Sequence, residues 1–223
     1  MTLENFKEIL INGSDEAKHK AISYANPKLL NAEIFYLLFD LLKDNSSHNR
    51  FFAIFHLIDK FSISLSGAEG VLIDDIYNSL FDKYAPIADR ATWALSIIGD
   101  KALDKLIEKY YSGAINTKIR ITYAIGRGNF SKRTKDRVKI LLTGLQSENK
   151  RLRFTAMCEM MSNTPISHQN ENEWNSTQDK SINFEEIYDK VLPIAKEFLK
   201  LENKKYKSFS NRYINWIEKR KKL

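Results

Sequence analysis

The sequence predicts an all-α fold, a solenoid of about five to six repeated helical hairpins, and three observations support this prediction. A basic residue followed by apolar residues one, four and five positions later recurs six times along the 223 residues. These offsets place the apolar residues on one face of an α-helix. Gly and Pro are scarce, with 8 and 4 residues, and no alternation of apolar and polar residues is long enough to support a strand. We therefore expect residues 1–223 to form one elongated repeat domain, in which each hairpin packs only on its neighbours.

The six recurrences predict the first helix of each hairpin. We call their basic residues the repeat-start cations, and they are separated by 30, 40, 30, 33 and 59 positions, which is typical of helical repeat arrays. Because the cation recurs at one position in every repeat, we expect it to bond a carboxylate or carbonyl of its own or the adjoining repeat. The six sets are Lys20, Ala21, Tyr24, Ala25; Arg50, Phe51, Ile54, Phe55; Arg90, Ala91, Ala94, Leu95; Arg120, Ile121, Ala124, Ile125; Arg153, Phe154, Met157, Cys158; and Arg212, Tyr213, Trp216, Ile217.

A second amphipathic segment follows each of the first five sets, and turn residues such as Asn26-Pro27 and Ser112-Gly113 separate the units. A short alternating stretch, Ser62 to Gly67, predicts a loop between the two helices of one repeat. The predicted second helices are 32–43, 71–84, 102–111, 132–146 and 184–201.

One segment, Thr164 to Ile182, departs from this pattern because it is rich in Asn, Ser, Gln and Glu and has almost no apolar residue besides Ile166 and Trp174. Such a composition predicts a mobile insertion inside the fifth repeat, because it buries too little apolar surface to offset the entropy of ordering. Trp174 then either packs back onto neighbouring helices, which we favour, or becomes buried on a partner.

Residues 88–107 resemble a HEAT repeat, with an Arg before an Ala-rich first helix, then a Gly-Asp turn and a Leu-rich second helix. The resemblance is close over residues 85–111, fair over 46–60 and 114–127, and weak at both ends. It implies a right-handed superhelix whose second helices line the concave surface. It implies no reaction, since HEAT proteins are mostly scaffolds and adaptors.

Charge is divided unevenly along the chain. Residues 1–112 contain 12 Lys/Arg and 16 Asp/Glu, whereas residues 113–223 contain 23 and 12. This asymmetry predicts an anionic partner for the second half. No apolar run approaches the ~18 residues that span a bilayer, and the single cysteine, Cys158, excludes an internal disulfide. Met1-Thr2-Leu3-Glu4 lacks a basic segment followed by an apolar one, so we expect no secretory signal. We therefore expect a soluble cytoplasmic protein without a membrane partner.

The candidate binding site lies in residues 118–153, where 11 Lys/Arg face two acidic residues, Asp136 and Glu148. Lys135 and Lys139 form a like-charged pair four positions apart, which costs about 0.2–0.5 kcal/mol on a helix. A helix with these small penalties either serves an anionic partner or presents a solvated basic face, and the sequence favours neither. The candidate partner-binding residues are Arg127, Lys132, Arg133, Lys135, Lys139, Lys150 and Arg151.

Two functions fit this site. The first is a non-enzymatic adaptor or regulator that binds an acidic protein surface through the concave side of repeats four and five. The alternative is nucleic-acid binding, with a HEAT-like DNA glycosylase as its enzymatic extreme. That alternative is weaker because Tyr123 and Phe130 are the only aromatic candidates for base stacking, and the tryptophans are placed differently from those of the glycosylases. No spacing of His or Cys suits a metal, so no metal, cofactor or catalytic residue is expected.

Overall fold

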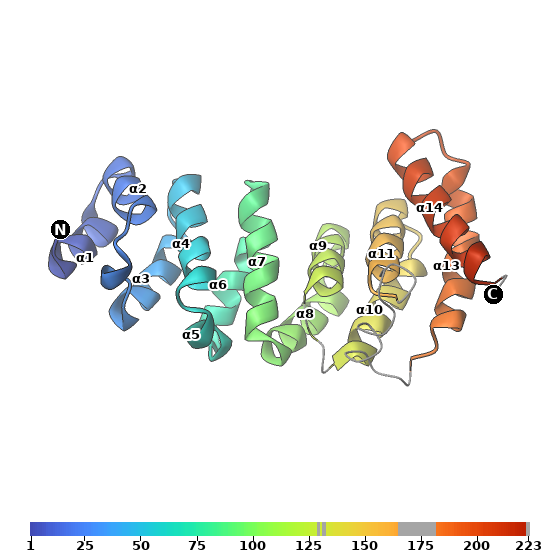
Figure 1. Ribbon diagram of the computed structural model, residues 1–223, viewed down its shortest axis with the longest axis horizontal. Coiled ribbons are helices and arrows are strands. Elements are labelled where there is room, and N and C mark those ends of the chain that lie inside the picture. Colours follow the sequence, from blue (N-terminus) through green and yellow to red (C-terminus); the bar gives the residue numbers. More distant parts are fainter. Residues whose placement is uncertain (129, 131–132, 165–181, 222–223) are drawn as a thin grey trace. The chain divides into compact units, whose positions relative to one another are not determined.

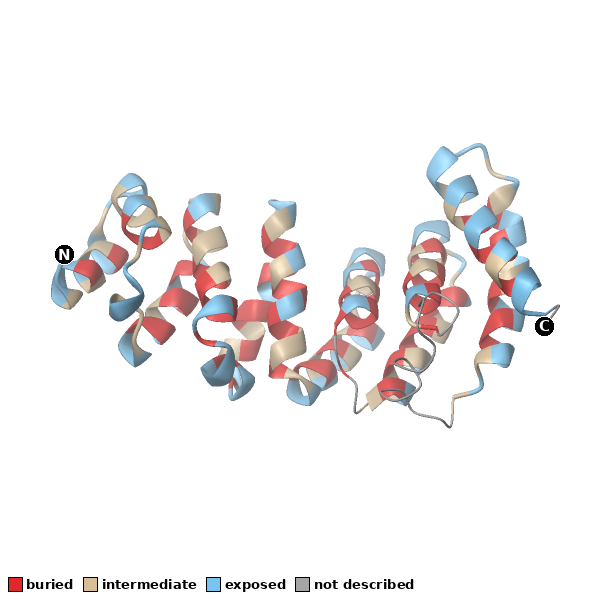
Figure 2. Cartoon of the chain, viewed as in Figure 1, coloured by how far each residue is buried: buried red, intermediate tan, exposed pale blue. Residues whose placement is uncertain are grey.

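The computed structural model describes residues 1–128, 130, 133–164 and 182–221 (Figure 1). In this part of the chain the regular elements are all helices, which confirms the predicted all-α fold of repeated helical hairpins. The chain divides into two compact units, Met1–Leu103 and Asp104–Leu223. Figure 2 shows that buried residues follow the helix faces that meet neighbouring helices, as expected when each helix contributes one apolar stripe.

The first unit is a succession of short amphipathic helices, several of which start at a polar capping residue. The side chains of Thr2, Ser14 and Asn31 accept hydrogen bonds from the first backbone N–H groups of their helices. Helix α4 packs on both α2 and α3, and α7 packs on both α4 and α6, so each helix contacts those of its own and the next hairpin. The helices are α1 (Leu3–Asn12), α2 (Asp15–Ser23), the 3-10 turn η1 (Pro27–Leu29), α3 (Ala32–Leu41), α4 (Ser47–Asp59), α5 (Ser62–Ser66), α6 (Val71–Ser79) and α7 (Ala85–Ile98).

The second unit is built around helix α11, which packs on α9, α10, α13 and α14. Its core contains Met157, Met160 and Met161 of α11 together with Val191 and Phe198 of α13, all at most 1% exposed. The boundary between the two units, between Leu103 and Asp104, falls inside helix α8. The helices are α8 (Asp100–Ser112), α9 (Ile115–Arg127), α10 (Thr134–Leu145), α11 (Lys150–Ser162), α13 (Phe184–Leu199) and α14 (Lys204–Arg220).

The predicted helix pattern agrees with these elements, with three differences. Residues 62–66 form the short helix α5 rather than a loop, and its Leu65 is fully buried. Tyr24 is 84% exposed because α2 ends at Ser23, so its offset no longer places the ring on the core face. Helix α1 was absent from the sequence prediction, although Phe6 and Leu10 on its inner face are buried.

Arg50 is the repeat-start cation that most fully connects two repeats. Its Nε lies 2.6 Å from Oδ2 of Asp82, which belongs to the turn after α6. Its Nη1 donates to the carbonyls of Asp44 and Asn45, at 2.8 and 2.9 Å. The guanidinium therefore ties α4 to the next repeat and also caps the turn before its own helix.

Two further repeat-start cations also bridge neighbouring helices. The guanidinium of Arg90 lies 4.3 Å from the ring centroid of Phe51 on α4, and Arg153 pairs with Glu197 of α13. The expected bond to a carboxylate or carbonyl is thus confirmed at Arg50 and Arg153, whereas Arg90 contacts an aromatic ring instead. The other three, Lys20, Arg120 and Arg212, are exposed.

The predicted insertion lies almost entirely outside the described residues, which omit 165–181 and therefore Ile166 and Trp174. Its first residue, Thr164, is buried, and its hydroxyl donates to the carbonyl of Met161 at 2.9 Å. Its last residue, Ile182, is half-buried before α13. In the described ranges, no helix has the length and apolar character needed to cross a membrane.

Candidate partner-binding surface

Helix α10 carries the predicted basic site, and one of its faces is buried while another is exposed. Ile140, Leu141 and Leu145 pack into the second unit, whereas Lys135 and Lys139 are exposed. The two lysines are four positions apart and therefore lie one turn apart on the same side of the helix. The pair therefore lies beside the apolar face of α10.

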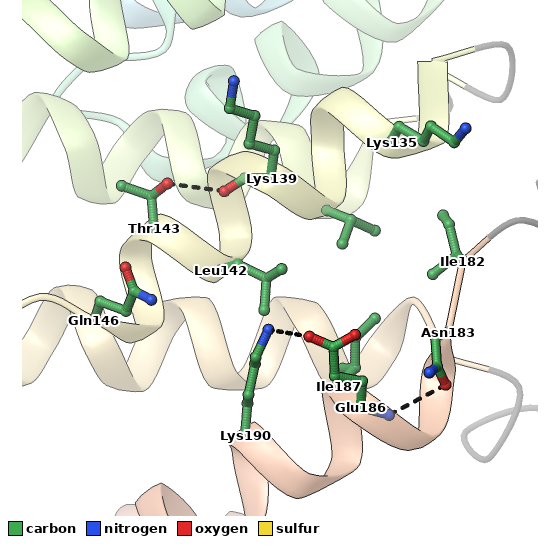
Figure 3. Close-up of a pocket in the computed structure, with 11 residues that line it drawn as sticks. Lys135, Lys139, Leu142, Thr143, Gln146, Ile182, Asn183, Glu186, Ile187 and Lys190 are labelled. Carbon is green, nitrogen blue, oxygen red and sulfur yellow. Dashed lines mark hydrogen bonds and ion pairs between the residues drawn. The ribbon is translucent and has the colours of Figure 1, made fainter.

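A pocket of about 320 Å³ lies between α10 and the start of α13, and we call it the α10–α13 pocket (Figure 3). The lining residues of α10 follow one side of the helix at steps of three and four positions, and those of α13 do the same. The lining residues are Lys135, Val138, Lys139, Leu142, Thr143, Gln146, Ile182, Asn183, Glu186, Ile187 and Lys190.

The pocket combines an apolar lining with a cationic edge. Leu142 on α10 faces Ile182 and Ile187 across it (Figure 3), and Val138 of α10 also belongs to the lining. On the α13 side, Nζ of Lys190 donates to Oε1 of Glu186 at 2.6 Å, so these two charges compensate each other. The positive charge of this edge therefore comes mainly from α10.

The ammonium groups of Lys135 and Lys139 point away from the Glu186 carboxylate in Figure 3. Lys139 forms no ion pair with any residue that the structure describes. Its charge is therefore available to an external anion. The neighbouring Thr143 hydroxyl donates to the carbonyl of Lys139 at 2.9 Å, an ordinary bond inside the helix.

Two other predicted site residues are occupied by contacts within the second unit. Arg133 pairs with Asp104 of α8 and with Asp136, whose Oδ2 lies 2.7 Å from its Nε, and these two carboxylates raise the pKa of the guanidinium. Arg127 stacks on Tyr123, with its guanidinium 4.3 Å from the ring centroid. Lys132 lies outside the described residues.

The remaining predicted cations, Lys150 and Arg151, occupy the first turn of α11 and are exposed. Neither forms an ion pair with a described residue. Of the seven predicted residues, the structure thus brings Lys135 and Lys139 together at the pocket, while Lys150 and Arg151 belong to another helix.

A buried polar cluster between α9, α10 and α11 was missed by the sequence prediction. Arg137 is 6% exposed, and its Nε donates to the carbonyl of Ile125 at 3.1 Å. Its Nη2 donates to Gly126 O at 3.3 Å and to Oδ1 of Asn163 at 2.6 Å. Burial lowers the pKa of Arg137 to about 10, which still leaves it charged at neutral pH. One signal was present in the sequence, because Arg137 lies four positions before Leu141 and therefore on the apolar face.

Glu159 of α11 is the carboxylate next to this cluster, with a side chain 7% exposed. Burial raises the pKa of Glu159 to about 7, and the Arg127 guanidinium, with Nε 3.5 Å from Oε1, opposes that rise. Cys158, the neighbouring residue, lies beside Tyr213, and burial raises the pKa of its thiol to about 12. A thiol with this pKa is a poor nucleophile at neutral pH.

In the described part of the chain, no group of three or more His, Cys, Asp and Glu side chains is placed to hold a metal ion.

Comparisons with known proteins found similar solved structures but no match by sequence. No protein-family model matches the sequence, and no curated protein matches it. Among solved structures, an archaeal HEAT-like repeats protein from Thermococcus onnurineus NA1 is similar over 98% of both chains, at 14% identity and a TM-score of 0.42. An engineered protein is similar over 98% of both chains, at 14% identity and a TM-score of 0.43. A designed armadillo repeat protein is similar over 97% of this chain and 100% of its own, at 12% identity and a TM-score of 0.39. The helical repeat architecture of this chain is established by its own helices and their packing.

Proposed function

We propose that the protein is a non-enzymatic protein-binding scaffold whose second unit engages an acidic surface of a partner protein. The observation that supports this proposal is a set of exposed cations that no carboxylate of the described residues neutralises: Lys139, Lys150 and Arg151. They belong to a unit, residues 104–223, with 25 Lys/Arg and 14 Asp/Glu. Complementary charge of this kind accelerates the encounter with an acidic surface and disfavours basic partners.

Nucleic acid is the competing partner, and the aromatic side chains argue against it. Binding to single strands gains from exposed rings on which bases stack, worth about 1–3 kcal/mol per base. Phe130 is 1% exposed and cannot stack on a base. Tyr123 is half-buried beneath the guanidinium of Arg127. Neither of these two aromatic side chains therefore offers a free ring on which a base could stack.

The test of this proposal uses charge reversal with a matched control. Lys135→Glu combined with Lys139→Glu should leave folding intact, because both side chains are exposed. The control, Lys20→Glu combined with Lys28→Glu, makes the same change of charge at two exposed lysines of the first unit. The partner is first captured by crosslinking in the native cell, and the association rate of the purified pair is then measured.

We expect the α10 double variant to slow association at least several-fold, and the control to leave it nearly unchanged, since peripheral charges mainly steer encounter. Equal rates for the two variants would contradict the proposal. A gel-retardation assay with duplex and single-stranded DNA at two salt concentrations tests the alternative that the surface binds nucleic acid. Tight, steeply salt-dependent DNA binding that the α10 variant abolishes would assign the surface to nucleic acid instead.

A further inference from the structure

We infer that the α10–α13 pocket receives one large apolar side chain of an acidic partner segment, while Lys135 and Lys139 bind the carboxylates that flank it. This inference rests on the proposed function and specifies the chemistry of the segment that is bound. It follows from the dimensions, the lining and the charge of the pocket.

The dimensions suit a short segment with one inserted side chain. The lining residues of α10 run from Lys135 to Gln146, and eleven helical steps of about 1.5 Å give a groove of roughly 16 Å. An extended segment covers that distance with about five residues at ~3.3 Å each. The pocket volume of about 320 Å³ is at the lower end of the roughly 300–1,000 Å³ found for ligand sites. One large side chain therefore uses the available space.

The lining selects the character of that side chain. Val138, Leu142, Ile182 and Ile187 offer only hydrocarbon to whatever enters. A charged side chain would lose its hydration without gaining a partner at these four residues. An aliphatic or aromatic group would instead bury apolar surface on both sides, so the inserted side chain is apolar.

The charge at the edge selects the flanking residues. Lys190 is already compensated by Glu186 at 2.6 Å, whereas Lys139 forms no ion pair with a described residue, so α10 supplies positive charge at this edge. Their four-residue spacing places them one helical turn, about 5.4 Å, apart along the edge. Carboxylates on either side of the inserted residue can meet them, and a basic segment would be repelled.

The experiment uses three labelled synthetic peptides and fluorescence anisotropy with the full-length chain. The first has a central tryptophan flanked by glutamates, the second replaces the tryptophan with alanine, and the third replaces the glutamates with lysines. We expect the first to bind about 10- to 100-fold more tightly than the second, the effect of burying one large apolar side chain. The third should not bind measurably.

Two kinds of variant locate the binding. Thr143→Trp places a large ring in the pocket from the side that faces solvent. It should reduce the affinity for the tryptophan peptide to the affinity measured for the alanine peptide. If this variant does not fold, Gln146→Trp, at an exposed residue of the same lining, replaces it. Lys135→Gln with Lys139→Gln should weaken both acidic peptides, whereas the matched control, Lys20→Gln with Lys28→Gln at two exposed lysines of the first unit, should weaken neither.

The outcomes distinguish this inference from the proposed function. Equal affinity for the tryptophan and alanine peptides, or full binding by the folded pocket-filling variants, would overturn the pocket as the site. So would failure of the wild-type chain to bind either acidic peptide. In these cases the proposed function still stands if charge reversal on α10 slows association with the captured partner. Conversely, the chain could bind the tryptophan peptide selectively while charge reversal on α10 leaves association with the captured partner unchanged. That result would support the pocket and overturn the proposed function.

Discussion

Glu159 illustrates how burial sets the protonation of a single residue. Its side chain is 7% exposed, and its ion-pair partner Arg127, with Nε 3.5 Å from Oε1, is itself 58% exposed. A half-solvated guanidinium attracts the carboxylate too weakly to offset its desolvation, so the pKa rises to about 7. At a pH between about 4.5 and 7, the native protein therefore holds a proton on Glu159. The unfolded chain, in which this carboxyl has its ordinary pKa near 4.5, has released that proton.

This difference predicts a pH dependence of stability. Between about pH 4.5 and pH 7 the native state binds more protons at Glu159 than the unfolded state does, so the free energy of unfolding should fall as pH rises through this window. At ~1.4 kcal/mol per pKa unit the loss is on the order of 2–3 kcal/mol. Urea denaturation at pH 5 and pH 8 measures it, with Glu159→Gln as the comparison. Since glutamine does not titrate, the variant should lack most of this fall, and an unchanged pH profile would refute the assignment.

A second residue-scale prediction concerns Arg137, whose guanidinium is bonded to the end of α9. Arg137→Ala should lower the free energy of unfolding by at least ~2 kcal/mol, because the Ile125 carbonyl and Oδ1 of Asn163 lose the guanidinium donor, and each such loss costs about 1–3 kcal/mol. Chemical denaturation gives the value. Arg137→Lys should recover only part, since an ammonium lacks the planar fork that reaches both Ile125 and Asn163. A fully stable alanine variant would show that water replaces the guanidinium.

At the scale of helices, glycine allows α9 and α10 to approach α11 closely. A Cβ added at Gly126 of α9 would lie 2.3 Å from Cβ of Glu159. At Gly144 of α10 it would lie 2.7 Å from Cβ of Ala156. Both distances are shorter than carbon atoms can approach, so α11 packs against its two neighbours at positions where neither can carry a side chain.

Gly126→Ala should therefore push α9 away from α11 and destabilise the second unit by about 1–3 kcal/mol, the usual cost of overpacking. Thermal denaturation followed by circular dichroism measures the loss. Gly67→Ala is the matched control, because its new Cβ would meet only the Ser64 carbonyl oxygen at 3.4 Å, an ordinary contact. We expect the control to stay within ~0.5 kcal/mol of the wild type. A similar effect of both substitutions would mean that helix packing is not the cause.

The helices were predictable because each carries its own apolar periodicity, as the burial of Ala91, Ala94 and Leu95 at the expected offsets shows. The short helix α5 was not, since five residues are too few to display a period. On α10 the exposure of Lys135 and Lys139 followed from their offset from the apolar face. The pocket beside them could not be foreseen, because it depends on where α13 lies, and the pairing of Arg133 with Asp104 depends on α8.

At the scale of the whole molecule, the two units carry opposite charge. The first unit, residues 1–103, contains 10 Lys/Arg and 14 Asp/Glu, and the second contains 25 and 14. The acidic first unit therefore offers little electrostatic attraction to an anionic partner.

We propose that residues 1–223 unfold as one domain, because repeat arrays are coupled through nearest-neighbour interfaces and α8 includes the residue at which the units divide. Scanning calorimetry should show a single endotherm whose calorimetric and van't Hoff enthalpies agree. Arg50→Ala, which removes the pair with Asp82 in the first unit, and Arg137→Ala in the second should each lower the midpoint of that same endotherm. Two separable endotherms, with each substitution shifting only one of them, would show that the units are independent domains.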